Sequence, residues 1–250
     1  MPTEFKLCTW NVWFDSHLQE ARINAIVAEL LSIAPDIVCL QEVTEPILAL
    51  IRQLIVGSPY VVFSDEASTR QYGQIALVNS QRINVASILY GSVPFPESRM
   101  GRRICCLTCT IGAKRFTILN VHLESEFSAN PNGTKANQLR YLLNFARSNA
   151  INFGTVIVCG DCNWSPQDDS WANRTLKEFA FRDVGLPTLS YDCTANSNIR
   201  GNFRSRLDRV LLPTEASLNW KQIQQIGTKP IRSLNIFPSD HFGIAMKFWF

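Results

Sequence analysis

Acidic, amide and imidazole side chains recur in five short segments of this 250-residue chain, each at the end of an apolar stretch. The segments cover residues 9–11, 40–43, 120–125, 160–163 and 238–241. A single carboxylate at the end of a strand is usually a solvated surface group. Five such ends, which include two of the three histidines of the chain, predict instead that these side chains converge on one site.

The residue types in these segments favour chemistry on a phosphate ester. Carboxylates such as those of Glu42 and Asp161 suit Mg²⁺, which binds through one or two carboxylates together with substrate phosphate. A catalytic zinc would need more imidazoles, so His122 and His241 are available for acid–base work or for stabilising charge. The chain has no G-x-S-x-G motif, P-loop or dinucleotide-binding glycine motif. Metal-assisted hydrolysis is therefore favoured over acyl transfer.

Apolar periodicity predicts the elements that position these residues. Strands are predicted over residues 5–10, 36–41, 60–63, 74–78, 83–89, 103–111, 116–122, 155–159, 207–212 and 244–248, with 59–123 forming one β meander. Helices are predicted around 23–31, from Thr44 onward, and around 135–149 and 171–179. Strands outnumber helices, and no linker or internal repeat divides the sequence. We therefore expect one α/β domain over residues 1–250, with two packed sheets and helices outside.

The same segments, in the same order, resemble the endonuclease/exonuclease/phosphatase superfamily of Mg²⁺-dependent phosphodiesterases and phosphatases. The resemblance extends from Thr9 to Gly243 and is strongest with the branch that removes tyrosine from DNA 5′ ends. It is carried by Thr-Trp-Asn at 9–11, Leu-Gln-Glu-Val at 40–43, Pro-Phe-Pro at 94–96, His-Leu-Glu-Ser at 122–125, Arg-Leu-Asp-Arg at 206–209 and Phe-Pro-Ser-Asp-His at 237–241. It implies a four-layer α/β/β/α sandwich of two mixed β-sheets flanked by helices.

The resemblance also implies a role for each matching residue in metal binding and in activation of water. Glu42 is the principal ligand of Mg²⁺, for which Mn²⁺ can substitute, and Asn11 and Asp240 support it. Asp161 orients and deprotonates the attacking water. Asn163 holds that water or a phosphate oxygen.

Four further residues are implied to contact the phosphate or to support a contact. His241, polarised by Asp208, donates to the phosphoryl oxygens as negative charge builds on them. His122 and Tyr72 add further phosphate contacts. Two of these roles have alternatives that stay open. Tyr72 can equally be an ordinary half-exposed strand residue, because a single tyrosine is common and unspecific. Asp208 can equally form a surface ion pair with the neighbouring Arg209.

The implied activity is hydrolysis of the bond between a tyrosine and a DNA 5′ end, which leaves a 5′-phosphate and repairs topoisomerase adducts. The alternatives within the superfamily are an abasic-site endonuclease, a nucleotide or RNA phosphodiesterase, and a lipid or inositol phosphate hydrolase. A nucleic-acid-binding module without catalysis would show a broken set of motif residues, whereas the set is complete here. The expected partner is therefore a DNA 5′ end with a tyrosyl adduct, or another nucleic acid, and we expect a monomer.

Positive charge is local in this sequence. The 24 Lys and Arg against 21 Asp and Glu give a net charge of +3, too small for a bulk attraction to polyanions. Arginines cluster at 99–103 and 200–209, beside the proposed phosphate-binding segments. Such runs are either solvated faces or a groove for a nucleic-acid backbone. The residues expected to contact DNA are the basic Arg103, Arg204 and Arg206 and an apolar wall of Tyr191, Ile199 and Trp164 for base stacking.

The eight cysteines and the apolar runs favour a cellular, reducing location. Two C-x-x-C pairs, at 106/109 and 159/162, allow a zinc ribbon, but strand residues three apart point to opposite faces, so buried free thiols are the better interpretation. No apolar run reaches the roughly 18 residues of a membrane span, and the first residues do not resemble a signal peptide. We expect an intracellular protein, nuclear and/or cytoplasmic, that does not bind membranes.

Overall fold

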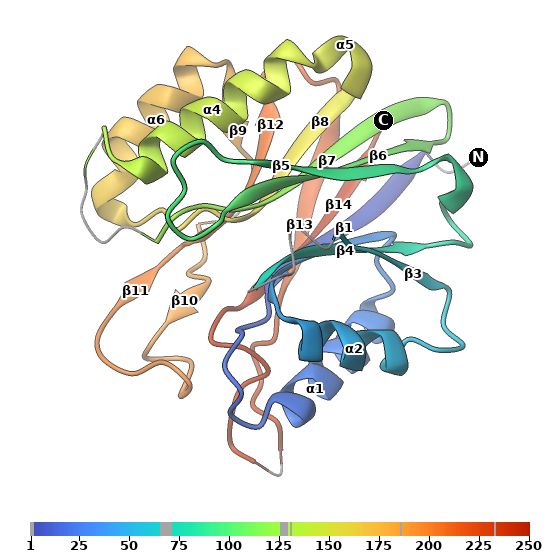
Figure 1. The fold of residues 1–250 in the computed structure, drawn as a ribbon, viewed down its shortest axis with the longest axis vertical. Coiled ribbons are helices and arrows are strands. Elements are labelled where there is room, and N and C mark those ends of the chain that lie inside the picture. The colour runs from blue at the N-terminus through green and yellow to red at the C-terminus, as the bar shows by residue number, and fades with distance from the viewer. Residues whose placement is uncertain (1–2, 66–71, 126–129, 131, 186, 233) are drawn as a thin grey trace.

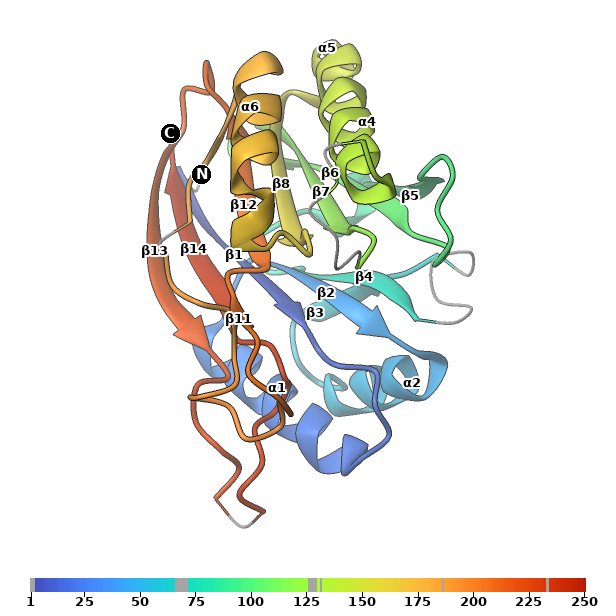
Figure 2. The ribbon, with the colours of Figure 1, turned by 90° about the vertical axis from the view of Figure 1, so that its left-hand side faces the viewer.

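The computed structural model describes residues 3–65, 72–125, 130, 132–185, 187–232 and 234–250. Two six-stranded mixed sheets pack face to face, and helices cover the outer face of each sheet (Figures 1 and 2). The layers follow the order helix, sheet, sheet, helix. The predicted α/β/β/α sandwich is confirmed.

The first sheet has the strand order β13-β14-β1-β2-β4-β3. Its strands are β1 (Glu4–Asn11), β2 (Ile37–Val43), β3 (Tyr60–Phe63), β4 (Gly73–Asn79), β13 (Asn219–Ile226) and β14 (Gly243–Trp249). β1 and β2 run parallel and are joined through α1 (Gln19–Ile33), whereas the other neighbours are antiparallel. α1 and α2 (Glu45–Leu54) cover its outer face (Figure 1).

The second sheet has the order β5-β6-β7-β8-β12-β9, and β10 (Tyr191–Asp192) and β11 (Arg204–Ser205) form a separate hairpin. Its strands are β5 (Leu89–Pro94), β6 (Arg103–Ile111), β7 (Lys114–His122), β8 (Thr155–Asp161), β9 (Phe181–Asp183) and β12 (Asp208–Pro213). Its helices are α4 (Thr134–Ser148), α5 (Ala150–Phe153) and α6 (Asp169–Glu178), and short 3₁₀ turns occupy Val85–Ser87 and Pro166–Asp168. Within the described residues, no helix is long and apolar enough to cross a membrane.

The two sheets share one pattern of strand directions, although their sequences do not repeat and the chain connects the strands differently. Each has a central parallel pair, β1 with β2 and β7 with β8, joined through a helix and flanked on both sides by antiparallel strands. The carboxyl ends of two parallel strands lie at one edge of their sheet. Each sheet therefore presents two strand ends side by side, and the packing of the sheets brings both pairs together.

Strands with apolar side chains on both faces build this packing. In β1, Phe5 and Leu7 belong to the apolar layer between the sheets, whereas Cys8 and Trp10 pack under the helices, as the period of two requires. The C-x-x-C pair in β6 divides in the same way, with Cys109 between the sheets and Cys106 against the helix layer of the second sheet. The eight cysteines, all within the described residues, form no disulfide.

Two predicted features of the sheets are wrong, and one long edge strand was not predicted. Residues 83–89 form mainly a 3₁₀ turn, and β5 begins only at Leu89. The predicted meander is divided, because β3 and β4 join the first sheet and β5 to β7 the second. β13 was not predicted because an edge strand that is mostly solvated, with the sequence NWKQIQQI, lacks an apolar pattern.

Candidate active site

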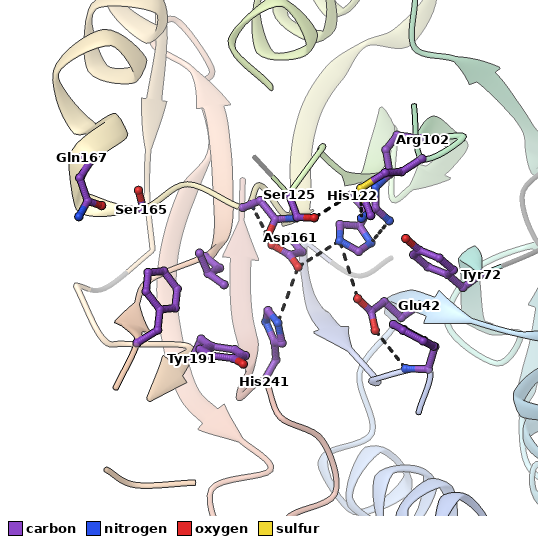
Figure 3. A pocket seen from close by; sticks show the side chains of 15 residues that line it. Glu42, Tyr72, Arg102, His122, Ser125, Asp161, Ser165, Gln167, Tyr191 and His241 are labelled. Carbon is purple, nitrogen blue, oxygen red and sulfur yellow. Dashed lines mark hydrogen bonds and ion pairs between the residues drawn. The ribbon is translucent and has the colours of Figure 1, made fainter. Parts of the chain in front are cut away.

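The carboxyl ends of the two parallel strand pairs meet across a pocket (Figure 3). Asn11 ends β1, Glu42 lies near the end of β2, His122 ends β7 and Asp161 ends β8. The pocket has a volume of about 540 Å³, and Glu42, His122, Asp161 and His241 are among its lining residues. The structure thus brings together the polar strand ends of all five segments.

Two buried amides join the sheets directly behind the pocket. Gln41 Nε2 donates to Asn120 Oδ1 at 2.7 Å, and Asn120 Nδ2 donates to two backbone carbonyls of the first sheet at 3.0 and 3.1 Å. The adjacent Glu42 has a φ of 61°, where the ladder between β2 and β4 is irregular. The amides fix the two sheets relative to one another, and the irregular backbone turns Glu42 toward the pocket.

Asp161 is at the centre of the hydrogen-bond network. Its Oδ2 accepts from Asn11 Nδ2 at 3.0 Å and lies 3.3 Å from His122 Nε2 and 3.8 Å from His241 Nε2. Its Oδ1 accepts from the backbone N–H of Asn163 at 2.8 Å. Because Asp161 is only 1% exposed, these donors rather than bulk water stabilise its charge.

Asn163, which has a φ of 47°, is held by two further contacts besides its bond to Asp161. Its Nδ2 donates to the carbonyl of Leu123 at 2.9 Å, and its own carbonyl accepts from Lys135 Nζ at 2.8 Å. Lys135 in turn forms a buried ion pair with Asp168 at 2.8 Å. The side chain of Asn163 therefore lines the pocket in a fixed position.

The surroundings of His122 favour its neutral form. Arg102 Nη1 donates to His122 Nδ1 at 2.8 Å, and a guanidinium has no acceptor atom. Burial and the charge of Arg102 lower the pKa of His122 to about 3. The ring proton is therefore on Nε2, which faces Asp161 and lies 4.0 Å from Glu42 Oε1.

The surroundings of His241, in contrast, favour its cationic form. Its Nδ1 donates to Asp208 Oδ2 at 2.8 Å, and Asp208 is fully buried opposite Asp161 in the β8–β12 ladder. Burial alone would lower the pKa of His241, but the carboxylates of Asp208 and Asp161 reverse this effect and place the pKa well above its ordinary value. His241 is therefore an imidazolium that presents Nε2–H to the pocket.

Glu42 and Asp240 are acidic residues that fit a divalent cation. Burial and then the charge of Asp240 raise the pKa of Glu42 to about 7, and burial raises the pKa of Asp240 as well. The N–H of Phe14 donates to Glu42 Oε2 at 3.0 Å. Two partly buried acids that ionise at a cost, with carboxylate and amide oxygens as ligand atoms, suit a hard cation such as Mg²⁺. Glu42, with Asn11 and Asp240 beside it, is thus able to hold this metal.

A second group of possible metal ligands lies next to the first, because Asn11 Nδ2 donates to Asp161. Asp161, Asp208 and His241 each offer one ligand atom, and these atoms lie within 4.8 Å of one another. However, the hydrogen bond between His241 Nδ1 and Asp208 Oδ2 already joins two of these side chains. The geometry of this group therefore favours a histidine–aspartate pair.

An aromatic wall lines the Glu42 side of the pocket. Tyr72 stacks on Phe14 with ring centroids 5.0 Å apart and an interplanar angle of 18°, and Arg102 Cζ lies 5.0 Å from the Tyr72 centroid. Phe14 is 48% exposed, so its ring is open to a ligand. Phe14 was not predicted as a site residue, although it lies only three residues after Asn11 in the sequence. Arg102 was predicted only as one member of a basic cluster.

A second wall lines the His241 side. Tyr191 lies 5.1 Å from His241 and 5.8 Å from Phe203 between ring centroids, and all three line the pocket with Leu207. Arg204 flanks this wall on β11 and forms a two-point ion pair with Asp192 at 2.8 and 3.0 Å. Tyr191 and Arg204 are therefore placed where a ligand entering the pocket can meet them.

Four residues predicted to contact DNA are engaged elsewhere. The two apolar ones are buried: Trp164 is 2% exposed and stacks against Arg209, and Ile199 is 7% exposed. Of the basic ones, Arg206 pairs with Asp183 at 2.6 Å, and Arg103 Nε donates to Ser92 Oγ at 2.7 Å. Neither Trp164 nor Ile199 therefore offers an open face to a base in this structure.

The fold and the site together define a class of protein. The class is a two-sheet α/β sandwich in which acids, amides and histidines from both sheets share one pocket. The model of the Endonuclease/Exonuclease/phosphatase family matches residues 8–241. The chain belongs to this family, which confirms the assignment made from its motifs.

Named relatives extend this result. The chain is 26% identical over 249 residues to tyrosyl-DNA phosphodiesterase 2 of Mus musculus, covering 94% of this chain and 64% of that protein. It is 27% identical over 252 residues to a 5′-tyrosyl-DNA phosphodiesterase of Caenorhabditis elegans, covering 98% of this chain and 67% of that protein. The crystal structure of D. rerio TDP2 complexed with single strand DNA product has the same fold as this chain. The TM-score is 0.82, the sequence identity is 22%, and 99% of both chains is covered.

Proposed function

We propose that this protein is a metal-dependent phosphodiesterase that hydrolyses the bond between a tyrosine and the 5′-phosphate of DNA. The observation that carries this proposal is the convergence of two imidazole N–H groups on Asp161, with Glu42 Oε1 4.0 Å from His122 Nε2 (Figure 3). This arrangement suits a phosphoryl group that gains negative charge during attack by water. The named relatives support the choice of a tyrosyl-DNA bond.

The residues at the ends of β7 and β8, together with His241 just before β14, handle the water and the phosphate. Asp161 accepts a proton from the attacking water, and Asn163 is held where it can contact that water or a phosphate oxygen. His122 and His241 turn their Nε2–H donors from Asp161 to the phosphoryl oxygens when these occupy the pocket. The fixed charge of His241 then stabilises the charge that develops on phosphorus-bound oxygen.

The leaving group needs little help from the protein. A tyrosine phenolate has a free pKa of about 10, so it departs with less protonation than an alkoxide would need. The aromatic wall of Tyr72 and Phe14 and the wall of Tyr191 and Phe203 provide two apolar surfaces for the two sides of the bond. The products are free tyrosine and a DNA 5′-phosphate.

Glu42, supported by Asn11 and Asp240, would hold the metal ion. When bound, Mg²⁺ would neutralise charge on the phosphate and orient it. Glu42 is itself held by the backbone N–H of Phe14, and Asn11 is held by its bond to Asp161.

The test is a substrate panel, in which the protein is incubated with a 5′-phosphotyrosyl oligonucleotide, abasic duplex DNA, a mononucleotide or sphingomyelin. Each reaction is run with Mg²⁺, Mn²⁺ or EDTA. We expect fastest release of tyrosine from the first substrate, a 5′-phosphate product, and no reaction in EDTA. Preferential cleavage of another substrate would overturn the proposal in favour of a different activity of the family. Binding of DNA without cleavage of any substrate would reduce the protein to a binding module.

A further inference from the structure

Glu124 forms a buried clamp on the loop between β5 and β6. Its Oε1 accepts from the backbone N–H groups of Arg99 and Met100 at 2.8 and 2.9 Å. Its Oε2 accepts from Ser98 Oγ and from Gln138 Nε2, each at 2.9 Å. Gln138 Oε1 accepts in return from the backbone N–H of Glu124 at 2.7 Å. With Glu124 3% and Gln138 1% exposed, the pair has little access to water that could replace these bonds.

The clamped loop delivers Arg102 to the active site. The backbone N–H of Arg102 donates to Ser98 Oγ at 2.8 Å, and its Nη2 lies 3.6 Å from the sulfur of Met100. The loop also contains Glu97 at φ 58° and Gly101 at φ 68°. A left-handed conformation is unfavourable for Glu97, so the loop depends on bonds from outside itself to keep its shape.

Arg102 determines which nitrogen of His122 carries the proton. Because every polar hydrogen-bonding atom of a guanidinium is a donor, the 2.8 Å contact requires His122 Nδ1 to be an acceptor. The proton is then on Nε2, 3.3 Å from Asp161 Oδ2. If Arg102 moved away, the proton could occupy either nitrogen, and His122 would lose its fixed donor toward the pocket.

We propose that Glu124 and Gln138 act through Arg102 as positioning residues that hold His122 as an Nε2–H donor toward the phosphate. The consequence for turnover rests on the proposed function, whereas the tautomer of His122 does not. Neither Glu124 nor Gln138 contacts the reacting atoms in this scheme. Their effect is carried by a single loop and one arginine.

A reciprocal swap tests the clamp. Each single variant replaces a hydrogen bond of the clamp by a repulsive contact. Glu124→Gln places a new amide N–H against a donor, either Gln138 Nε2 or the two backbone N–H groups. Gln138→Glu places its carboxylate against that of Glu124. The double variant Glu124→Gln/Gln138→Glu again pairs a donor with an acceptor and keeps the net charge. The exposed Glu178→Gln on α6 is the control for loss of one negative charge.

The readouts are steady-state kinetics on the phosphotyrosyl oligonucleotide and the ¹⁵N resonances of His122, which are assignable because the chain has three histidines. We expect each single variant to lower kcat about 100-fold with little change in KM, as for a catalytic group displaced by about 1 Å. The ¹⁵N resonances should show Nδ1 partly protonated. The double variant should recover kcat to within about threefold of the wild type and restore the single tautomer.

Three results would overturn the clamp. The double variant could be as slow as the single ones, the single variants could keep the wild-type kcat, or His122 could stay an Nε2–H tautomer in Glu124→Gln. If the wild-type protein does not cleave the substrate at all, the proposed function fails, and the ¹⁵N tautomer still tests the clamp. Circular dichroism and Tm identify a variant that fails to fold, and then the milder Gln138→Asn, which shortens one partner, takes its place with the same expected shift in tautomer.

Discussion

The two sheets have the same pattern of strand directions but supply different chemistry. The parallel pair of the first sheet ends in Asn11 and Glu42, and the parallel pair of the second ends in His122 and Asp161. Glu42 and Asp161 therefore occupy equivalent places, each near the end of the second strand of its pair. The backbone determines where these side chains meet, and the residue types determine what they do.

The surroundings of the two acids separate their roles. Asp161 accepts hydrogen bonds from Asn11 and Asn163 and faces two imidazole N–H groups. Glu42 faces Asp240, and burial together with this second acid raises its pKa to about 7. The acid with several donors is suited to hold a water and accept its proton, and the acid with another acid beside it is suited to a cation.

The largest expected effect is that of Asp161→Asn. The amide cannot accept a proton from water, and its N–H group would face the donors of His122 and His241, so we expect kcat to fall by up to about 10⁴-fold. Binding of Mg²⁺ measured by calorimetry should be nearly unchanged, as should Tm. Substantial turnover by this variant would show that the two acids have been assigned to the wrong roles.

Glu42→Gln should have a smaller and metal-dependent effect. Loss of the principal ligand should lower the rate about 10³-fold at low Mg²⁺, corresponding to several kcal/mol of charge stabilisation. Raising the Mg²⁺ concentration should recover part of the loss, because the defect is one of affinity. Measuring the rate over a range of Mg²⁺ concentrations checks this. If added Mg²⁺ rescued Asp161→Asn equally well, the assignment of cation binding to Glu42 and of proton acceptance to Asp161 would be contradicted.

Asp208→Asn tests the charge of His241, with Asp183→Asn as a control acid in the same sheet. An amide no longer stabilises the imidazolium, so we expect kcat to fall about 10²-fold. His241 is cationic below its pKa and loses its charge as pH rises through it. Because the carboxylates of Asp208 and Asp161 raise this pKa, the variant should lose activity at a lower pH than the wild type does. An unshifted alkaline limb in the pH–rate profile would exclude this role.

The smallest effects are expected at the arginines. Arg204 is half exposed beside Tyr191, so Arg204→Gln should raise KM for DNA about threefold and reduce the slope of log KM against log salt by about one. Arg206 is held by Asp183 with 15% of its side chain exposed, and Arg206→Gln should change neither quantity. Equal effects of both variants on the salt dependence would mean that Arg206 leaves its partner to reach DNA.

Sequence predicted the helices and most strands because their apolar periodicities are local and strong. The helix around 135–149, for example, corresponds to α4. It did not predict β13, whose sequence is mostly polar, or the division of residues 59–123 between two sheets. Strand pairing depends on contacts between distant segments, and a one-dimensional pattern does not contain them.

The sequence by itself determined which side chains end the strands, and therefore the family and the type of chemistry. The order of Asn11, Glu42, His122, Asp161 and His241 along the chain was enough for that. Only the tertiary structure decided that Trp164 is buried and that Arg102 bonds His122 Nδ1 while Asp208 bonds His241 Nδ1. Burial and charge state arise from neighbours that are remote in sequence, so one motif histidine is neutral and the other is cationic.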